Sequence, residues 1–184
     1  MRLFRHSIRF TIAACAVVAM AVPASAGTEP EGLQPGPSRQ PTSHSSQSAA
    51  WTVGTLTIPA IGVDEVVRLG VDPSVLNRGV GLWAGTSEPG GEGNVVLAGH
   101  RTTYSRPFSN LDKLTVGDIV SMTDADGIDV IYRVSETMIV EPEDMWITYD
   151  HETPTLTMFA CHPKGSAEKR IVVVAELVSS QRML

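Results

Sequence analysis

The residue with the clearest potential for chemistry is Cys161, because it is the one cysteine outside the N-terminal segment of the chain. The second cysteine, Cys15, falls within an apolar stretch that is typical of an export signal. No disulfide can therefore form within the exported domain. A lone thiol of this kind is a reactive nucleophile, an intermolecular link or a buried and inert side chain, and the count leaves these three open.

A cysteine nucleophile needs a partner that removes its proton, and this partner is usually a histidine. His100 ends an apolar run over residues 94–99, so a buried strand would deliver it to a rim, where functional residues are usually found. His162 follows Cys161 directly, and neighbouring residues of a strand point to opposite faces. His151 lies in a polar loop. His100 is the preferred partner, and a structural histidine at a strand end is the alternative.

Thioester chemistry also generates an oxyanion, which a positive or N–H-rich group must stabilise. Arg170 follows Cys161 closely in the chain, and a short connection between two antiparallel strands would bring it back beside the cysteine. Arginine stays protonated and can donate hydrogen bonds throughout a reaction. Lys164, Lys169 and Arg101 compete for this role, and each of them is as easily a solvated charge.

The elements that must position these residues are short β-strands. From Trp51 onward, runs rich in Val, Ile and Thr are broken at close spacing by Gly, Pro, Asn and Asp. The pattern predicts short helices near 73–78 and 107–114. It predicts strands near residues 53–58, 63–70, 94–99, 117–123, 128–140, 154–161 and 170–178. Many short strands without alternating helices predict an all-β sandwich or closed barrel.

The first 50 residues of the chain have a different character. Residues 1–26 have a cationic start, an apolar run and small residues at a cleavage site, which predicts a signal peptide or, as the alternative, an N-terminal membrane anchor. A lipoprotein site at Cys15 is disfavoured, because the apolar run continues past it. Residues 27–50 are rich in Pro and Ser and predict a disordered stalk. The catalytic domain would then span residues 51–184.

Charge and motif content exclude several classes of protein. Of 14 Lys and Arg residues, three fall within residues 1–26, so 11 remain against 20 Asp and Glu. An acidic domain lacks the cations that a nucleic-acid binder needs. No metal-binding motif is present. The acidic stretches 124–129 and 141–144 could host calcium, but the first departs from the EF-hand pattern and is better explained as a polar turn. We therefore predict no cofactor, with Ca²⁺ left open.

Three spaced motifs together closely resemble those of the sortase family. They are residues 97–104 (LAGHRTTY), residues 157–163 (TMFACHP) and Arg170. Residues 58–63 (IPAIGV) and 93–96 (GNVV) are similar to the first strands and the histidine-bearing strand of that family. The resemblance covers roughly residues 53–178. The Cys-His-Pro sequence, with Ser166-Ala167 downstream, looks most like the class E sortases of high-GC Gram-positive bacteria.

The resemblance implies a closed eight-stranded β-barrel with short helices and a cysteine transpeptidase activity. Such enzymes cleave an LPXTG-like sorting signal, or LAXTG in class E, after its Thr. They hold the product as a thioester and pass it to an amine of a peptidoglycan precursor or cross-bridge. The partners implied are surface proteins with a C-terminal sorting signal. The site would be extracytoplasmic, at the cell surface, on a monomer that is membrane-anchored or secreted after signal cleavage and binds no nucleic acid.

Carried over to this sequence, the resemblance gives Cys161 the role of nucleophile, His100 that of acid and base, and Arg170 that of oxyanion support. Tyr104, Phe159 and Ala160 would bind substrate, with Tyr104 helping to read the Ala of LAXTG. One departure is Ala160, because the family commonly has Thr before the nucleophile. The missing hydroxyl puts the fine positioning of substrate in doubt.

Three other interpretations stay open. An L,D-transpeptidase is also an exported cysteine enzyme, but it would show Ser-Xaa-Gly-Cys around its nucleophile, unlike residues 159–162. A papain-like thiol peptidase would place its cysteine before its histidine, whereas His100 precedes Cys161. A non-catalytic secreted β-barrel binding module would have an inert Cys161 and no role for His100.

Overall fold

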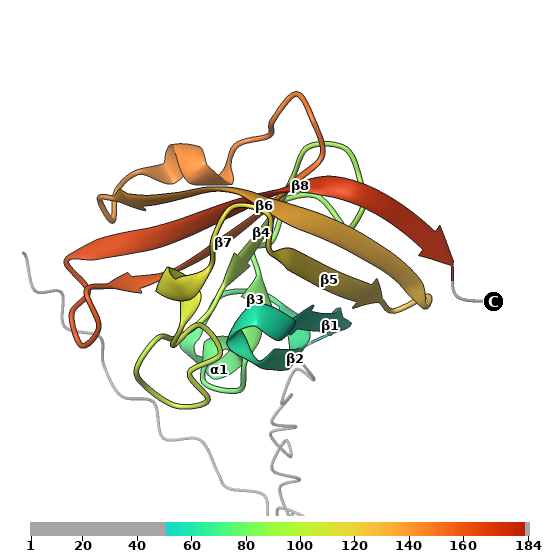
Figure 1. Ribbon diagram of the computed structural model, residues 1–184. Helices are drawn as coiled ribbons and strands as arrows, with labels where there is room; N and C mark the ends of the chain where they lie inside the picture. Colours follow the sequence, from blue (N-terminus) through green and yellow to red (C-terminus); the bar gives the residue numbers. More distant parts are fainter. Residues whose placement is uncertain (1–50, 183–184) are drawn as a thin grey trace, which may run out of the picture. The chain divides into compact units, whose positions relative to one another are not determined.

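Eight β-strands close into a barrel in the order β1-β2-β3-β4-β7-β8-β6-β5 (Figure 1). The structure is a computed structural model that describes residues 51–182. The predicted signal segment 1–26 and stalk 27–50 lie outside the described residues. The strands are β1 (Thr52–Ile58), β2 (Val63–Leu69), β3 (Val80–Leu82), β4 (Asn94–Ala98), β5 (Ile119–Asp124), β6 (Ile128–Val140), β7 (Thr155–His162) and β8 (Lys169–Arg182). The all-β closed barrel is confirmed.

Helices are few and short in the described part of the chain. They are η1 (Pro59–Ile61), α1 (Pro73–Leu76), η2 (Leu111–Lys113) and η3 (Met145–Thr148). The helix expected over 107–114 is thus reduced to one 3₁₀ turn, and η3 was not predicted. Within residues 51–182, none of these helices has the length and apolar character needed to cross a membrane.

The seven strands predicted from the sequence are all present, but β3 was missed. It has only three residues, and it pairs in parallel with β2 through Val67 and Val80. A Cβ on Gly81 would lie 2.2 Å from the backbone oxygen of Gly70, so only glycine allows the two segments to approach this closely. A glycine inside so short an apolar run weakens the strand signal, which is why the sequence pattern did not indicate β3.

Strand alternation divides the apolar residues between the barrel interior and its outer face. On β7, Leu156, Met158 and Ala160 belong to the large interior cluster. Phe159 packs on the outer face in a second cluster with Val172, Val174, Val140 and Ile147. The outer cluster exists because the segment 141–154, which contains η3, covers this side of the sheet; Figure 1 shows it in orange.

Both acidic stretches form turns, which the sequence predicted for residues 124–129. Between β5 and β6, the Asp124 carboxylate accepts hydrogen bonds from the backbone N–H groups of Asp126 and Ile128. After β6, the Asp144 carboxylate accepts one from the N–H of Glu141. Across residues 51–182, no three His, Cys, Asp or Glu side chains gather as a metal ion would require. The absence of a cofactor stays a prediction.

Candidate active site

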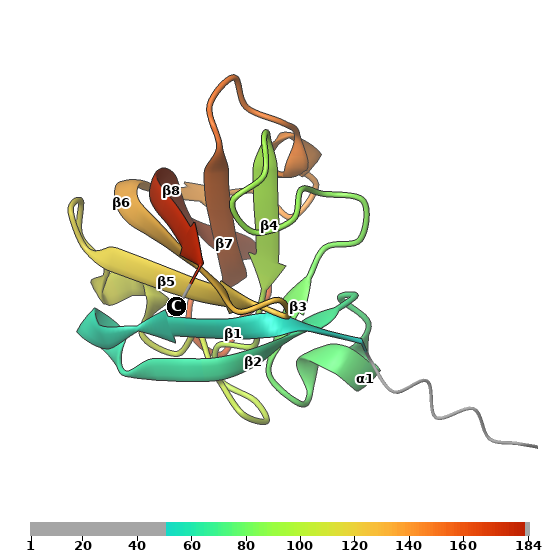
Figure 2. The same ribbon diagram turned by 90° about the vertical axis from the view of Figure 1, so that its right-hand side faces the viewer.

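His100 and Cys161 follow neighbouring strands of the barrel. Strands β4 and β7 run parallel, in a register that begins at Asn94 opposite Thr155 and ends at Ala98 opposite Phe159. Figure 2 shows the two strands side by side. His100 and Cys161 each come two residues after the last pair, so the topology brings both to one end of the sheet.

Cys161 and Arg170 lie directly opposite each other on β7 and β8, which form an antiparallel pair. Residues in such a register share a face of the sheet and lie close enough for their side chains to interact. Both are half-buried. The Arg170 guanidinium donates through Nη1 to the carbonyl oxygens of Ala167 and Lys169, each at 2.9 Å. Its Nε and Nη2 bond no other residue of the described chain, so they remain available as donors.

His100 is held by two contacts from outside its own strand. Its Nε2 lies 3.1 Å from the Oδ1 of Asn77, the residue that ends α1. Its ring lies 5.2 Å from that of Tyr104, centroid to centroid. An amide oxygen accepts, so Nε2 of His100 is the donor in this contact. Asn77 was missed, because nothing in the sequence places α1 beside His100.

The three predicted substrate-binding residues differ in where they point. Tyr104 is 64% exposed on the loop after β4. Phe159 shares the outer face of β7 with Cys161 and packs against Trp83, with ring centroids 6.0 Å apart. Ala160 is only 3% exposed and faces the barrel interior. Its side chain lies in the core beneath the site, and its part in substrate binding stays a prediction.

The histidines and cations that competed for catalytic roles have other partners. His151 lies 3.2 Å from the hydroxyl of Thr155, and His162 lies 2.8 Å from Arg101. Among the cations, Arg101 and Lys164 approach Asp112, and Lys169 pairs with Glu141. The rivals of Arg170 are thus engaged with carboxylates, which strengthens the case for Arg170 itself.

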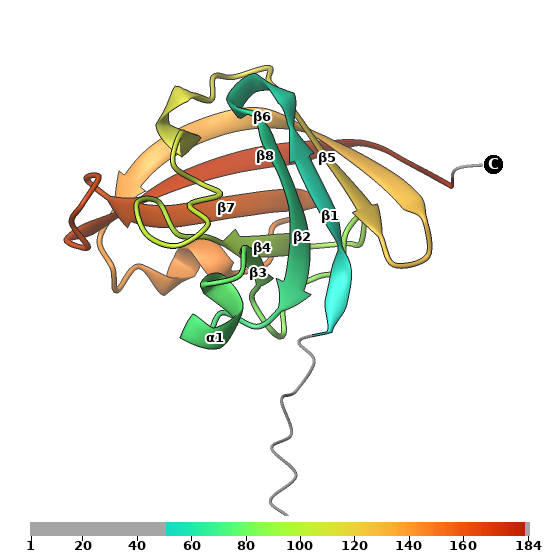
Figure 3. The same cartoon turned by 90° about the horizontal axis from the view of Figure 1, so that it is seen from below.

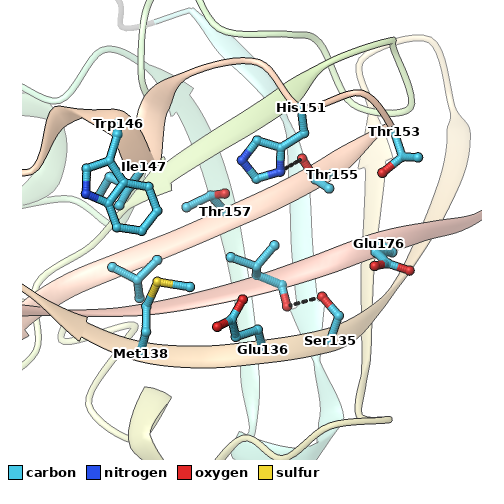
Figure 4. A pocket seen from close by; sticks show the side chains of 12 residues that line it. Ser135, Glu136, Met138, Trp146, Ile147, His151, Thr153, Thr155, Thr157 and Glu176 are labelled. Atoms are coloured by element: carbon cyan, nitrogen blue, oxygen red, sulfur yellow. Dashed lines mark hydrogen bonds between the residues drawn. The ribbon is translucent and has the colours of Figure 1, made fainter.

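The buried side chain of Asn94 hydrogen-bonds the segment 141–154 to the barrel. Its amide N–H groups donate to the backbone oxygens of Ile147 and Tyr149, both at 3.0 Å. Its Oδ1 accepts from the hydroxyl of Thr157 at 2.9 Å. Next to this anchor, the segment roofs a pocket of about 220 Å³ over the outer faces of β6, β7 and β8 (Figure 4). The sequence pattern had indicated only that Asn94 begins a strand.

We expect Asn94→Leu to lower the free energy of unfolding by roughly 3 kcal/mol, because two backbone oxygens and a buried hydroxyl lose their partner. Chemical denaturation measures this loss. Asn110→Leu is the matched control, since Asn110 is half-buried and its side chain does not cap η2. Equal stability of the Asn94→Leu and Asn110→Leu proteins would show that the anchor is not needed.

A thiol, an imidazole and a guanidinium lie at the ends of three neighbouring strands of a closed all-β barrel. The fold and the site therefore define a β-barrel protein with a candidate cysteine nucleophile. A family model described as the Sortase domain matches residues 56–178. The chain belongs to the sortase family.

Individual relatives agree with the family assignment. Sortase D of Bacillus subtilis (strain 168) is 32% identical over 130 residues, which make up 68% of this chain and 64% of that protein. A solved sortase D5 transpeptidase of Clostridium perfringens is 31% identical, with a TM-score of 0.63 over 70% of this chain and 79% of the other. A sortase E mutant of Streptomyces avermitilis is 29% identical, with a TM-score of 0.65 over 72% and 91%.

The relatives belong to several classes within the family. Similar solved structures carry the names sortase A, C, D and E, so structural likeness is shared by all four classes. The matched region spans less than two thirds of the length of the Bacillus relative, at 64%. The assignment is therefore to the family as a whole.

Proposed function

We propose that this chain is a cysteine transpeptidase that cleaves a sorting-signal peptide and transfers its acyl part to an amine. The observation that supports the proposal is the pairing of β4, β7 and β8, which brings three residues to one end of the sheet. Cys161 lies opposite Arg170, and His100 leaves the neighbouring parallel strand at the same end. A nucleophile, a proton carrier and a fixed cation are the groups that acyl transfer through a thioester requires.

In the proposed reaction, the Cys161 sulfur attacks the Thr carbonyl carbon of the signal, and its proton passes to His100. The oxyanion that forms lies near the Arg170 guanidinium. Collapse breaks the C–N bond, and His100 returns the proton to the leaving amine. The incoming amine then attacks the thioester and gives a proton to His100, and Cys161 leaves as the thiolate, which regains that proton.

The substrate class is an LAXTG- or LPXTG-like signal near the C-terminus of surface proteins, and the acceptor is a peptidoglycan precursor or cross-bridge amine. The enzyme works outside the cytoplasm, at the cell surface, either held by residues 1–26 or released after their cleavage. The Cys-His-Pro sequence at residues 161–163 supports a class E enzyme. The net acidic charge argues against a nucleic-acid partner.

The test is an assay with fluorogenic LAXTG and LPXTG peptides and a glycine-based or other primary amine as acceptor. We expect cleavage after Thr, an acyl-enzyme mass on Cys161, and faster turnover of LAXTG. Absence of both cleavage and acyl-enzyme with either peptide would overturn the proposal. Turnover of a D-amino-acid stem peptide instead would favour an L,D-transpeptidase.

Tyr104 is a candidate reader of the signal, because its exposed ring lies beside that of His100. We expect Tyr104→Ala to reduce the preference for LAXTG over LPXTG by about 10-fold in kcat/KM, which corresponds to about 1.4 kcal/mol. Tyr104→Phe keeps the ring and should keep the preference. An unchanged ratio in the alanine variant would remove Tyr104 from substrate recognition.

A further inference from the structure

A second pair of residues, next in sequence to His100 and Cys161, joins the ends of β4 and β7. Arg101 directly follows His100, and His162 directly follows Cys161. The Nη1 of Arg101 lies 2.8 Å from the Nδ1 of His162. A guanidinium only donates, so Nδ1 accepts and His162 is neutral, with its proton on Nε2.

This contact lies where the backbone no longer holds the two segments together. The last backbone hydrogen bond between them runs from the N–H of Gly99 to the oxygen of Phe159, at 3.3 Å. Beyond it, within the described chain, no backbone hydrogen bond joins residues 100–101 to 160–162. Figure 3 shows the loop after β4 lying beside the end of β7. The hydrogen bond between the Arg101 and His162 side chains therefore joins the two segments at the positions that carry the site, where backbone hydrogen bonds no longer do so.

The hydrogen bond between Arg101 and His162 is supported by a second, charged partner of Arg101. The Arg101 side chain is 2% exposed, and its Nη2 lies 2.8 Å from the Oδ1 of Asp112. Burial alone would raise the pKa of Asp112, but the hydrogen bond and charge of Arg101 lower it, so the pair stays ionised. The buried Nε of Arg101 has no partner in the described chain. The Asp112 carboxylate of this ion pair is exposed to solvent, so the pair itself adds little net stability.

We propose that Arg101 and His162 are positioning residues that set the spacing between His100 and Cys161. The inference rests on the proposed function. A proton moves between sulfur and imidazole only at hydrogen-bond distance, so a small displacement of either strand end slows the chemical step. Loss of the bond should lower kcat and leave KM for the peptide nearly unchanged, because the substrate-facing groups stay in place.

The test compares variants that remove or keep the acceptor at position 162. We expect His162→Leu and Arg101→Met each to lower kcat by at least about 10-fold, with KM within about 2-fold. His162→Asn should recover most of kcat, because its amide oxygen can occupy the place of Nδ1. Val67→Ala is the stability control, since it opens a cavity in β2, which carries no site residue, and should leave kcat unchanged.

A purely structural role would lower the melting temperature of His162→Leu and leave its kcat unchanged, as in Val67→Ala, which would overturn the proposal. Equal loss of kcat in His162→Asn and His162→Leu would also overturn it. If Arg101→Met does not fold, the two position-162 variants decide alone. Histidine ¹⁵N NMR of the resting protein gives a readout without turnover: His162 should show a proton on Nε2 and none on Nδ1. Failure of the proposed function looks different, because the unsubstituted protein itself would then not cleave the peptides.

Discussion

Replacement of Cys161 by alanine is expected to abolish cleavage of the sorting-signal peptide, with a fall in kcat/KM of at least about 10⁴-fold. The reason is chemical rather than structural. Without the sulfur no thioester forms, and the neighbouring groups can only polarise a carbonyl that nothing attacks. The fold should persist, because Cys161 is a half-buried strand residue whose backbone pairs with β8.

Peptide cleavage and intact-protein mass spectrometry measure this prediction together. The unsubstituted protein should gain the mass of the acyl group, and the Cys161→Ala protein should not. Cys15→Ala is the matched control, since it removes the other cysteine from a segment with no predicted part in the chemistry. Release of the threonyl product by the Cys161→Ala protein would show that another group is the nucleophile.

The parts of the fold that could be predicted are those encoded by neighbouring residues. Alternation and turn residues located seven strands, including the long β6 and the strand that bears Cys161. The connection between β7 and β8 is short and antiparallel, so the approach of Arg170 to Cys161 followed from the sequence as well. The parallel pair of β4 with β7 joins distant segments, and no local pattern encodes it.

The same distinction applies to the site. Asn77, Asn94 and the link between Arg101 and His162 depend on contacts between segments far apart in the chain, so no local pattern could indicate them. The direction of the Ala160 side chain, in contrast, could have been predicted from the sequence. Adjacent residues of a strand face opposite sides, so a cysteine on the outer face places Ala160 in the interior.

The second large effect is expected for Arg170→Ala, which should lower kcat by about 10³-fold. Arg170 is the one candidate cation set opposite the nucleophile by strand register, and it has donors left after its bonds to Ala167 and Lys169. An oxyanion that forms next to Cys161 would lose these donors. Arg170→Lys keeps the charge but not the planar fork, so its kcat should fall between the two.

A loss of activity without a loss of stability separates a catalytic role of Arg170 from a structural one. Arg170 is half-buried and its backbone pairing with Cys161 does not depend on the side chain, so the melting temperature of Arg170→Ala should change little. Arg133→Ala, which replaces an exposed arginine on β6, is the matched control and should keep full activity. A fall in kcat/KM without a loss of fold places Arg170 at the developing charge. Unchanged turnover would instead mean that backbone N–H groups stabilise the oxyanion alone.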